Sequence, residues 1–454
     1  MHNRVIYTLN EIVEATGGRL LLKGADLFTG LSIDSRTIRD GELFIALKGE
    51  RFDGHDFLGQ ALQRANGALV SYPPTIPQRG KSIIYVSNTL KALQAIARHR
   101  RASRNVKVIG ITGTNGKTTT KEMIGAILKK RFSVLLSSGN LNNQIGMPLS
   151  LSGLNGQEIA VLEFGASQPG DIDELCRISS PDVGVITNIG PGHIAGFGSL
   201  EMVRDTKLEI AGYADILVLN SDDRLLRERI ETLKERGKRV VTFGLEEQAN
   251  YRAVDIKRTE ESISFKVVGG EYGKIDLELP LIGLFNVYNA LAAVSVAGLF
   301  SIDAGLVSEA IGAFRGVPMR VERREFKGAL LISDLYNANP ASMEEALKEL
   351  ASLRKKRAIA VLGDMLELGA YEETAHRKIG RLVAELPVDV LITVGQRMAY
   401  AGEEFQQNTN GSRLHFHASE VDEAKRLLEG LVREDDTVLV KGSRGMKLER
   451  ILEE

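Results

Sequence analysis

A glycine-rich turn between an apolar strand and a helix constrains the fold of this chain more than any other feature. The apolar strand covers residues 106–111, the turn contains Gly113 and Gly116, and a helical pattern starts near Thr118. Two glycines let the backbone turn tightly, so that its N–H groups can point at phosphate oxygens. The N-terminus of the following helix adds further donors and a favourable dipole. This order of strand, turn and helix predicts a P-loop in an α/β sheet.

The residues of this turn suit the phosphates of ATP. Lys117 offers a point charge to the β- and γ-phosphates, and Thr118 offers a hydroxyl to Mg²⁺. Ile111 departs from the usual G-x-x-x-x-G-K pattern, which has glycine at that position. A chance glycine-rich turn is the alternative, although strand, lysine, threonine and helix are all in place. We predict that the phosphates are bound by Gly113, Thr114, Asn115, Gly116, Lys117, Thr118 and Thr119.

The length of the chain and the order of its apolar segments predict three α/β domains. With 454 residues, the chain is too long for one ordinary domain. We expect an N-terminal domain over residues 1–100, a central domain over 101–315 and a C-terminal Rossmann-like domain over 316–454. In the two outer domains, the expected strands are residues 43–47, 83–86, 330–333, 358–362, 390–394 and 437–440, and the expected helices are residues 9–15, 57–65, 342–352, 372–384 and 420–428.

The central domain is expected to contain a parallel sheet with helices on both faces, because short apolar runs alternate there with helical patterns. These runs are residues 106–111, 159–162, 183–187, 216–219 and 240–243. Residues 251–283 differ, since apolar and polar residues alternate on both sides of Gly269 and Gly270, which predicts an antiparallel appendage. Helices over 287–299 and near 306–314 complete the domain.

Charge and cysteine content exclude several classes of protein. The chain has 58 basic and 59 acidic residues, a net charge of -1, so no global charge draws it to nucleic acid or an anionic membrane. Its single cysteine, Cys176, excludes an intramolecular disulfide and a multi-cysteine metal site, and we expect it to pack in a helix. No apolar run approaches the roughly 20 residues of a membrane span or resembles a signal peptide. We predict a cytoplasmic monomer without nucleic-acid partners or membrane insertion.

Several segments together resemble the Mur ligase superfamily, whose members use ATP to join an amino acid or dipeptide to a carboxylate. The phosphate loop has that superfamily's form, in which Ile111 is no anomaly. The other matching segments are residues 34–36, 43–55, 140–149, 163–167, 187–193, 285–293, 334–340 and 441–447. The resemblance covers nearly the whole chain and implies a UDP-substrate domain, a P-loop ATPase domain and a Rossmann-like domain in that order.

Three strings within these segments resemble the MurF branch of the superfamily. They are Asp-Leu-Tyr-Asn-Ala-Asn-Pro at 334–340, Asn-Leu-Asn-Asn at 140–143 and Gly-Ser-Arg-Gly-Met at 442–446. MurF enzymes ligate D-alanyl-D-alanine to UDP-N-acetylmuramoyl-tripeptide through an acyl phosphate, giving the UDP-MurNAc-pentapeptide precursor of peptidoglycan. The resemblance therefore implies an ATP-dependent ligase with these two small-molecule substrates.

Other functions fit the sequence less well. A MurE-type ligase, which adds the third amino acid, usually carries an Asp-Asn-Pro-Arg string that is missing from this sequence. A folylpolyglutamate-synthase-type enzyme would not have a UDP-type first domain. A non-catalytic scaffold should lack at least one of the four expected catalytic residues Lys117, Glu163, His193 and Lys207, and all are present. A P-loop motor or DNA-acting ATPase would show a basic face, of which the charge balance gives no hint.

The expected metal ligands are Thr118, Glu163, His193 and Lys207, serving two Mg²⁺ ions. Glu163 ends an apolar strand at the edge where parallel sheets bind ligands, so we assign it to Mg²⁺ together with Thr118. A lone histidine is more often structural, and the resemblance implies instead that His193 serves a second Mg²⁺. It also implies that Lys207 is carbamoylated by CO₂, although a lysine on a helix is ordinarily a plain surface residue.

ATP is expected to lie between the central and C-terminal domains. Asn286 and Asn289 lie three residues apart on one helix face and can present amides to adenine or ribose, although an N-cap role for Asn286 is an alternative. Arg320 is expected at the γ-phosphate, Asp334 at the ribose hydroxyls and Asn337 at the base edge. A nucleotide held by two domains implies that they close before catalysis, which keeps water from the acyl phosphate.

The UDP portion of the substrate is expected to be held by Ser32, Asp34, Ser35 and Arg36, which resemble the family's UDP loop. A turn or helix cap at Asp34 and Ser35 is an equally good interpretation. Asn142 and Asn143 are expected to contact the substrate near the metal ions. We place Asp364 and Glu367, which follow a strand of the C-terminal domain, near the incoming dipeptide.

Overall fold

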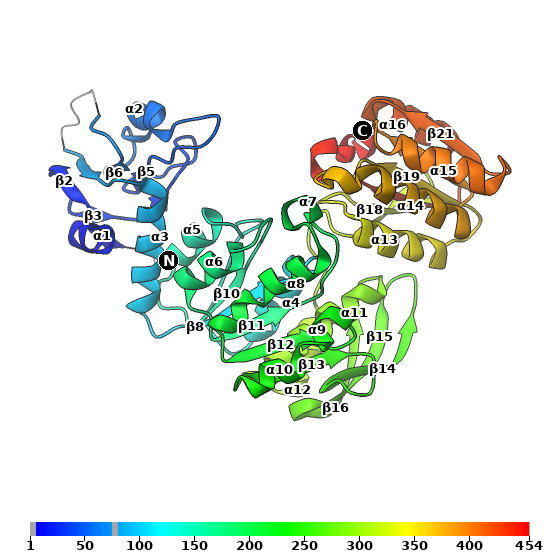
Figure 1. The fold of residues 1–454 in the computed structure, drawn as a ribbon, viewed down its shortest axis with the longest axis horizontal. Coiled ribbons are helices and arrows are strands. Elements are labelled where there is room, and N and C mark those ends of the chain that lie inside the picture. Colours follow the sequence, from blue (N-terminus) through cyan, green and yellow to red (C-terminus); the bar gives the residue numbers. More distant parts are fainter. Residues whose placement is uncertain (1–5, 75–79, 454) are drawn as a thin grey trace.

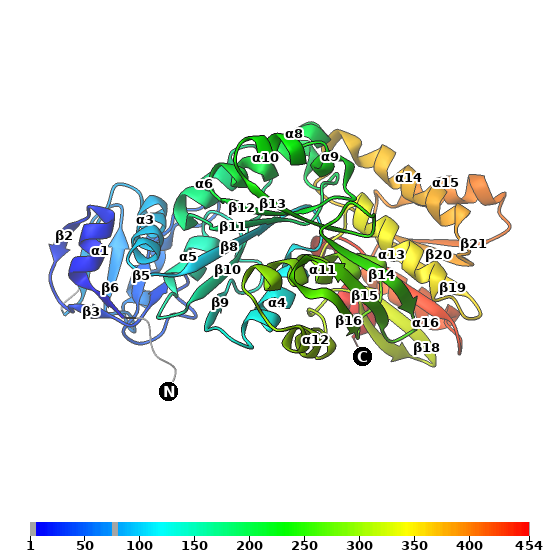
Figure 2. The same ribbon diagram turned by 90° about the horizontal axis from the view of Figure 1, so that it is seen from below.

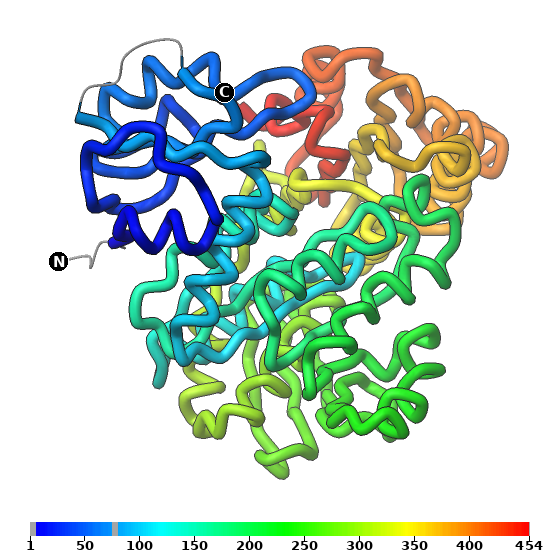
Figure 3. The backbone as a smooth tube through the Cα atoms, turned by 60° about the vertical axis from the view of Figure 1, so that its left-hand side comes forward, coloured from blue at the N-terminus to red at the C-terminus, as the bar shows by residue number. Residues whose placement is uncertain are grey.

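The computed structural model describes residues 6–74 and 80–453. They form three α/β units, each built on its own main sheet, and the central unit lies between the other two (Figure 1, Figure 2). The backbone tube in Figure 3 follows the chain through the three units in sequence order, from blue to red. The three-domain α/β architecture predicted from the sequence is therefore confirmed.

The N-terminal unit contains a five-stranded sheet in which β4, β5, β6 and β7 are parallel and β2 is antiparallel to β7. A separate pair, β1 with β3, lies beside it. The strands are β1 (Tyr7–Thr8), β2 (Arg19–Leu22), β3 (Leu27–Phe28), β4 (Leu31–Ser32), β5 (Leu43–Ile45), β6 (Gly67–Val70) and β7 (Ser82–Tyr85). The helices are α1 (Leu9–Thr16), η1 (Gly54–Phe57), α2 (Leu58–Ala61) and α3 (Thr89–Ala102).

One helix of this unit is shorter than predicted. The helical pattern over residues 57–65 corresponds to a 3₁₀ turn, η1, followed by the single turn of α2. Gly54 and Gly59 are weak helix formers, and Asp53 caps the 3₁₀ turn by accepting from the His55 N–H. The segment therefore lacks the propensity for a longer helix.

The central unit contains a nine-stranded sheet in the order β16-β15-β14-β13-β12-β11-β8-β10-β9. Strands β8 to β14 are parallel to one another. β15 and β16 add an antiparallel hairpin at one edge, as the sequence predicted. The strands are β8 (Lys107–Thr112), β9 (Val134–Leu136), β10 (Ile159–Glu163), β11 (Val183–Ile186), β12 (Ile216–Asn220), β13 (Arg239–Gly244), β14 (Tyr251–Arg258), β15 (Ile263–Gly269) and β16 (Gly273–Leu279). The short edge strand β9 was not predicted.

Helices cover both faces of this sheet. On one face, α4 packs against α11 in a core that also contains Ile109, Ile111 and Val161 from the parallel strands. The opposite face is covered by α5, α6 and α8 (Figure 2). The helices are α4 (Lys117–Leu128), α5 (Gly146–Ser152), α6 (Asp171–Ser179), α7 (Ile194–Phe197), α8 (Leu200–Leu208), η2 (Glu209–Gly212), α9 (Arg224–Arg227), α10 (Ile230–Glu235), η3 (Gly270–Tyr272), α11 (Leu284–Leu299) and α12 (Ala304–Gly312).

The C-terminal unit contains a six-stranded sheet in the order β17-β18-β22-β19-β20-β21, in which β17 alone is antiparallel to its neighbour. The strands are β17 (Glu322–Phe326), β18 (Ala329–Asp334), β19 (Ala358–Gly363), β20 (Val390–Val394), β21 (Leu414–Ala418) and β22 (Thr437–Lys441). The helices are α13 (Pro340–Ser352), η4 (Gly369–Tyr371), α14 (Glu372–Glu385), α15 (Ala399–Thr409), α16 (Val421–Leu431), η5 (Arg444–Met446) and η6 (Leu448–Leu452). The two edge strands and α15 were not predicted.

A buried arginine joins the N-terminal unit to the central one. Arg100, in the last turn of α3, is 2% exposed, and its Nε donates to the carbonyl oxygen of Leu154 at 2.8 Å. Its guanidinium lies 4.7 Å from the ring centroid of Tyr7, whose hydroxyl donates to the carbonyl oxygen of Ser152. The first strand and α3 are thus both fixed to the end of α5. The domain boundary expected at residue 100 falls inside α3.

The single cysteine is structural. Cys176 lies on α6 and is fully buried among Leu162, Ile172 and Leu175. Burial raises the pKa of its thiol, so the reactive thiolate is suppressed. The expectation that it packs in a helix is confirmed. Within residues 6–74 and 80–453, none of the helices has the length and apolar character needed to cross a membrane.

Candidate active site

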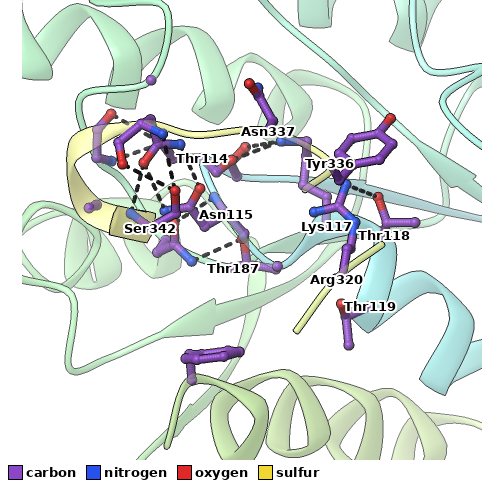
Figure 4. A pocket seen from close by; sticks show the side chains of 18 of the residues that line it. Thr114, Asn115, Lys117, Thr118, Thr119, Thr187, Arg320, Tyr336, Asn337 and Ser342 are labelled. Atoms are coloured by element: carbon purple, nitrogen blue, oxygen red, sulfur yellow. Dashed lines mark hydrogen bonds between the residues drawn. The ribbon is translucent and has the colours of Figure 1, made fainter. Parts of the chain in front are cut away.

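A cavity of about 720 Å³ lies where the carboxyl ends of the central parallel strands face the C-terminal unit. Strand β8 stands between β10 and β11, and the loops after all three strands contribute to its wall. Ligands of open parallel sheets bind at this kind of crevice. Figure 4 shows that the labelled side chains come from the phosphate loop, from the loop after β11 and from the C-terminal unit.

The phosphate loop closes on itself through its lysine. The Lys117 ammonium donates to the carbonyl oxygens of Gly113 and Thr114, at 2.9 and 3.0 Å. Burial lowers the pKa of Lys117; the nearby Arg320 lowers it too, whereas Glu163 opposes the shift. α4 begins at this lysine, so its N-terminus faces the cavity. The predicted P-loop geometry is therefore present.

The two loop glycines are required by space as well as by backbone conformation. Gly113 has φ 142°, and a Cβ there would lie 1.9 Å from Thr187 Oγ1. Gly116 has φ 80°, and a Cβ there would lie 2.3 Å from Asn289 Oδ1. A side chain at either position would meet strain and a clash together. Ile111 lies inside β8 and is fully buried, so it belongs to the sheet core and not to the turn.

Thr118 and Glu163 form an oxygen-rich pair at the foot of the cavity. The Thr118 hydroxyl donates to Glu163 Oε2 at 2.8 Å, and Glu163 is 2% exposed. Asn142 Nδ2 donates to the other carboxylate oxygen at 2.9 Å, and Arg320 Nη2 donates to the Thr118 hydroxyl at 3.0 Å. A carboxylate beside a hydroxyl is a donor set that suits Mg²⁺. In the two described ranges, no three His, Cys, Asp or Glu side chains converge, so phosphate or water oxygens would have to complete such a site.

Lys207 and His193 also line the cavity. Lys207, on α8, is 4% exposed, and burial together with Lys117 lowers the pKa of its amine to about 7. His193 precedes α7 in a left-handed conformation, with φ 53°, and its Nδ1 lies 2.9 Å from Glu367 Oε2. Burial lowers the pKa of His193, and the cations Lys117 and Lys207 add to this effect against the opposing Glu367. The structure thus gathers the four expected catalytic residues around one cavity.

The two helix asparagines support the phosphate loop. Asn286 Nδ2 donates to the carbonyl oxygen of Ile282 at 2.7 Å, and Asn289 Nδ2 donates to Asn286 Oδ1 at 3.1 Å. Asn289 Oδ1 accepts from the Thr120 hydroxyl at 3.2 Å, next to Gly116. The N-cap alternative for Asn286 is wrong, because α11 begins at Leu284 after Gly283. Both asparagines line the cavity, and their contact with adenine stays a prediction.

Arg320, Asp334 and Asn337 of the C-terminal unit line the same cavity, as expected. The Arg320 guanidinium stacks 4.0 Å from the ring centroid of Tyr336. Asp334 is paired with Lys441, whose ammonium also donates to the carbonyl oxygen of Asn337 at 3.1 Å. The side chains of Asp334 and Lys441 therefore hold the end of β18 against the end of β22.

The four residues expected to bind UDP lie elsewhere. Among the residues that the structure describes, the wall of this cavity does not include Ser32, Asp34, Ser35 or Arg36. Asp34 accepts from the backbone N–H and the guanidinium of Arg36, each at 2.9 Å, and these hydrogen bonds hold its pKa at about 2. The turn interpretation is thus supported, and a UDP contact remains a prediction.

Of the four residues expected near the acceptor and the incoming dipeptide, all in the described part of the chain, Asn142, Asn143 and Glu367 line the cavity and Asp364 does not. Asn142 and Asn143 line the cavity, and Asn143 Oδ1 accepts from the N–H of Gly146, the first residue of α5, at 2.8 Å. Glu367 also lines the cavity. Asp364 is 3% exposed and accepts from the Met398 N–H at 2.7 Å. Among the residues that the structure describes, those lining the cavity do not include Asp364. Its carboxylate fixes the turn that leads into α15.

Two further asparagines, Asn188 and Asn339, hold the phosphate loop, a role that was not predicted from the sequence. Asn188 Oδ1 accepts from the Asn115 N–H at 2.9 Å, and its Nδ2 donates to the Asn115 carbonyl oxygen at 3.0 Å. Asn339, from the C-terminal unit, donates to Asn115 Oδ1 at 2.8 Å. Both stand inside segments that the sequence singled out, but the partner across 224 residues is visible only in the fold.

Comparison with known proteins places the whole chain in one family. Residues 27–101 match the model for the Mur ligase family catalytic domain, 111–297 the Mur ligase middle domain and 319–444 the Mur ligase glutamate ligase domain. UDP-N-acetylmuramoyl-tripeptide–D-alanyl-D-alanine ligase of Bacillus subtilis is 37% identical over 94% of this chain and 92% of its own.

Solved structures agree with these matches. MurF from Acinetobacter baumannii is 30% identical, with a TM-score of 0.90 over 99% of this chain and 98% of its own. MurF ligase from Thermotoga maritima, solved in complex with ADP, is also 30% identical, with a TM-score of 0.81 over 93% of this chain and 96% of its own. Both the sequence and the fold therefore match over nearly the full length. The chain belongs to the Mur ligase family.

Proposed function

We propose that the chain ligates D-alanyl-D-alanine to UDP-N-acetylmuramoyl-tripeptide with ATP, giving the UDP-MurNAc-pentapeptide precursor of peptidoglycan. The observation that carries this is the cavity in which Lys117, Thr118 and Glu163 meet Arg320 from the C-terminal unit. The substrates are inferred from the near full-length similarity to UDP-N-acetylmuramoyl-tripeptide–D-alanyl-D-alanine ligase of Bacillus subtilis. An ADP complex of the Thermotoga maritima relative supports ATP as the nucleotide.

The reaction needs cations because two anions must meet. A carboxylate reacts with an amine only after its oxygen becomes a good leaving group, so ATP first phosphorylates the carboxylate. The amine then displaces phosphate from the acyl phosphate and loses a proton. Lys117 and Arg320 hold positive charge where the triphosphate and the carboxylate approach, which lowers the repulsion between them. The backbone N–H groups at the start of α4 would supply donors for the same phosphates.

Two Mg²⁺ ions are part of the proposal. Thr118 and Glu163 would hold one of them, since a hydroxyl and a carboxylate are hard oxygen ligands. His193 and a carbamoylated Lys207 would hold the second. Bound Mg²⁺ would neutralise charge that develops on the phosphate oxygens. Imidazole is an unusual Mg²⁺ ligand, so the contact of His193 with the metal should be weak.

The environment of Lys207 supports its carbamoylation. A neutral amine attacks the carbon of CO₂, and the nitrogen then releases one proton to leave a carbamate anion. Burial holds the pKa of this amine at about 7, so much of it is neutral near physiological pH. Intact-protein mass measurement or ¹³C spectroscopy with labelled bicarbonate should detect the carbamate, and Lys207→Arg should remove the signal. A bare ammonium in wild type under these conditions would contradict the proposal.

The remaining assignments complete this picture of the substrates. Asn286, Asn289, Asp334 and Asn337 would face the adenosine of ATP, and Ser32, Asp34, Ser35 and Arg36 the UDP portion of the acceptor. Asn142 and Asn143 would contact the acceptor near the metal ions. The three domains would span residues 1–100, 101–315 and 316–454, in a cytoplasmic monomer. Nucleotide binding between two domains implies that they close before phosphoryl transfer.

The choice of amine distinguishes the candidate reactions. Purified protein is incubated with ATP, Mg²⁺ and either UDP-MurNAc-tripeptide or UDP-MurNAc-dipeptide. ADP release is followed with D-alanyl-D-alanine, meso-diaminopimelate or L-lysine as the amine. We expect turnover with D-alanyl-D-alanine only. Turnover with a free diamino acid on UDP-MurNAc-dipeptide, and none with D-alanyl-D-alanine, would instead establish a MurE-type reaction.

A further inference from the structure

Helix α13 of the C-terminal unit contacts the central unit at both of its ends. Its N-cap, Asn339, lies at the phosphate loop, and its last turn, which contains Glu349 and Ser352, lies at the end of β14. Figure 1 and Figure 2 both show α13 beside the ends of β14 and β15. Helix α13 thus runs from the phosphate loop to the turn between β14 and β15 of the central sheet.

The contact at the N-terminal end joins two amide side chains. Asn339 Nδ2 donates to Asn115 Oδ1 at 2.8 Å, and Asn115 Nδ2 lies 3.5 Å from Asn339 Oδ1. The same Asn339 Oδ1 accepts from the Ser342 N–H at 2.9 Å and so caps the helix. The backbone of Asn115 is held independently by Asn188 and by the Thr187 hydroxyl, which donates to its carbonyl oxygen at 2.6 Å. The Asn115 side chain is therefore available to its partner on α13 while the loop keeps its shape.

The contact at the other end is ionic and partly buried. Arg258, at the end of β14, pairs with Glu349, which is 4% exposed, and its Nη2 donates to the Ser352 hydroxyl at 3.1 Å. Just beyond, Lys355 Nζ lies 2.8 Å from Glu260 Oε2. Arg323 Nη2 donates to the carbonyl oxygen of Glu261 at 3.0 Å. The C-terminal unit thus contacts the central unit at the turn between β14 and β15.

We propose that Asn339 is a positioning residue that couples the docking of the C-terminal domain against the central domain to the position of the phosphate loop. When the C-terminal end of α13 pairs with Arg258, the N-terminal end of the helix places Asn339 within hydrogen-bonding distance of Asn115. Arg320 reaches Thr118 in the same arrangement, so the C-terminal domain touches the loop on both sides of Lys117. Phosphoryl transfer is then fastest when the phosphate loop is held from both domains. This inference rests on the proposed ligase function for its kinetic readout.

Two substitutions remove the amide contact from opposite sides. Asn339→Ser keeps a good N-cap, because a serine hydroxyl can accept from the Ser342 N–H, but is too short to reach Asn115. Asn115→Ala removes the partner and leaves the backbone contacts with Asn188. We expect each variant to lower kcat about three- to tenfold, the worth of one hydrogen bond. Asn339→Ser should leave the affinity for ADP unchanged, because Asn339 is not one of the residues assigned to the nucleotide. The double variant should be no slower than either single variant, because both remove the same contact.

Lys348→Ala is the matched control. Lys348 lies in the middle of α13, half exposed, and pairs with Glu344 of the same helix at 2.8 Å. Its substitution weakens the helix slightly without touching either end, so kcat should stay at the wild-type value. Losses that multiply in the double variant, or a fall in the ADP affinity of Asn339→Ser that matches its fall in kcat, would overturn the coupling.

A second measurement does not need the acceptor substrates. Hydrogen exchange of residues 340–352 is compared in wild type and Asn339→Ser, with and without a non-hydrolysable ATP analogue. The analogue should protect this segment in wild type and protect it less in the variant. Equal protection in both would overturn the proposal. Absence of ligase turnover in wild type would count against the proposed function alone.

Discussion

Lys117 is the residue on which the nucleotide site depends most directly. Its ammonium is held by two carbonyl oxygens of its own loop, so the charge is already in place before a phosphate arrives. Lys117→Met keeps the apolar stem and removes the charge. We expect kcat/KM for ATP to fall by at least about 100-fold, the effect typical of removing one preorganised charge contact. Lys130→Met, in the turn just after α4, is the control, and substantial ADP release by Lys117→Met would contradict the assigned role.

Gly116 tests the geometry of the loop independently of its charge. Gly116→Ala would place a methyl group against Asn289 Oδ1 and force alanine to φ 80°. We expect about 1–3 kcal/mol of destabilisation together with weaker ADP binding, measured by denaturant unfolding and calorimetry. Gly59→Ala is the matched control, because that glycine has open space and no left-handed φ, and the change should be neutral or slightly stabilising. Normal ADP affinity in Gly116→Ala would show that the loop tolerates a side chain.

The sequence allows the loop residues to be identified but not their partners. The spacing of Gly113, Gly116 and Lys117 after an apolar strand predicts a phosphate site, because each residue type has a local reason to stand there. The contact between Asn115 and Asn339 has no local cause, since it depends on how two domains pack. Asp334 and Lys441 are another such case: each ends a strand, and their pairing follows from the adjacency of β18 and β22.

At the level of elements, burial decides which strands could be predicted. β8, β10, β19 and β22 are buried along nearly all of their length and appear as apolar runs. β17 reads Glu-Arg-Arg-Glu-Phe and lies at a sheet edge, where charged residues discourage pairing with another chain, so it has no apolar pattern. β9 has only three residues, all half-buried, and lies at an edge of the central sheet.

Helix α14 contains a histidine whose protonation should destabilise the C-terminal domain. His376 is fully buried, its Nε2 accepts from the Met365 N–H at 3.0 Å, and its Nδ1 lies 2.7 Å from the Glu372 carbonyl oxygen. Both contacts are made only by the neutral ring with a proton on Nδ1. Burial lowers the pKa of His376 below its ordinary value. The unfolded chain therefore takes up the proton first, and the stabilisation, full above about pH 6.5, is lost as the pH falls toward the folded pKa.

The melting temperature of wild type should accordingly drop between pH 7.5 and pH 5.5. His376→Gln can accept the same bond from Met365 without titrating, so its melting temperature should depend less on pH over this range. The comparison with wild type removes the contributions of His193 and His415, which are common to both proteins. An identical pH dependence in wild type and variant would show that His376 is not the group responsible.

Across the whole molecule, the two outer domains are attached differently. The N-terminal domain is joined through the buried Arg100 and its contacts near the end of α5. The C-terminal domain meets the central one at the phosphate loop and at an exposed and a partly buried ion pair. Arg100→Met keeps the apolar stem but leaves the Leu154 carbonyl oxygen without its charged donor. We expect about 1–3 kcal/mol of destabilisation, measured by thermal unfolding. Arg98→Met, exposed on the same helix, is the control and should be neutral; equal stability of both variants would contradict a structural role for Arg100.

The burial of Cys176 has a practical consequence for observing domain movement. With its thiol enclosed in α6 and its ionisation suppressed, the native protein should resist maleimide and disulfide reagents. Cysteines introduced on exposed positions of the central and C-terminal domains would then be the ones that take a fluorophore or spin label. The wild-type background is in this sense already suited to single-molecule distance measurements, without prior removal of a native cysteine.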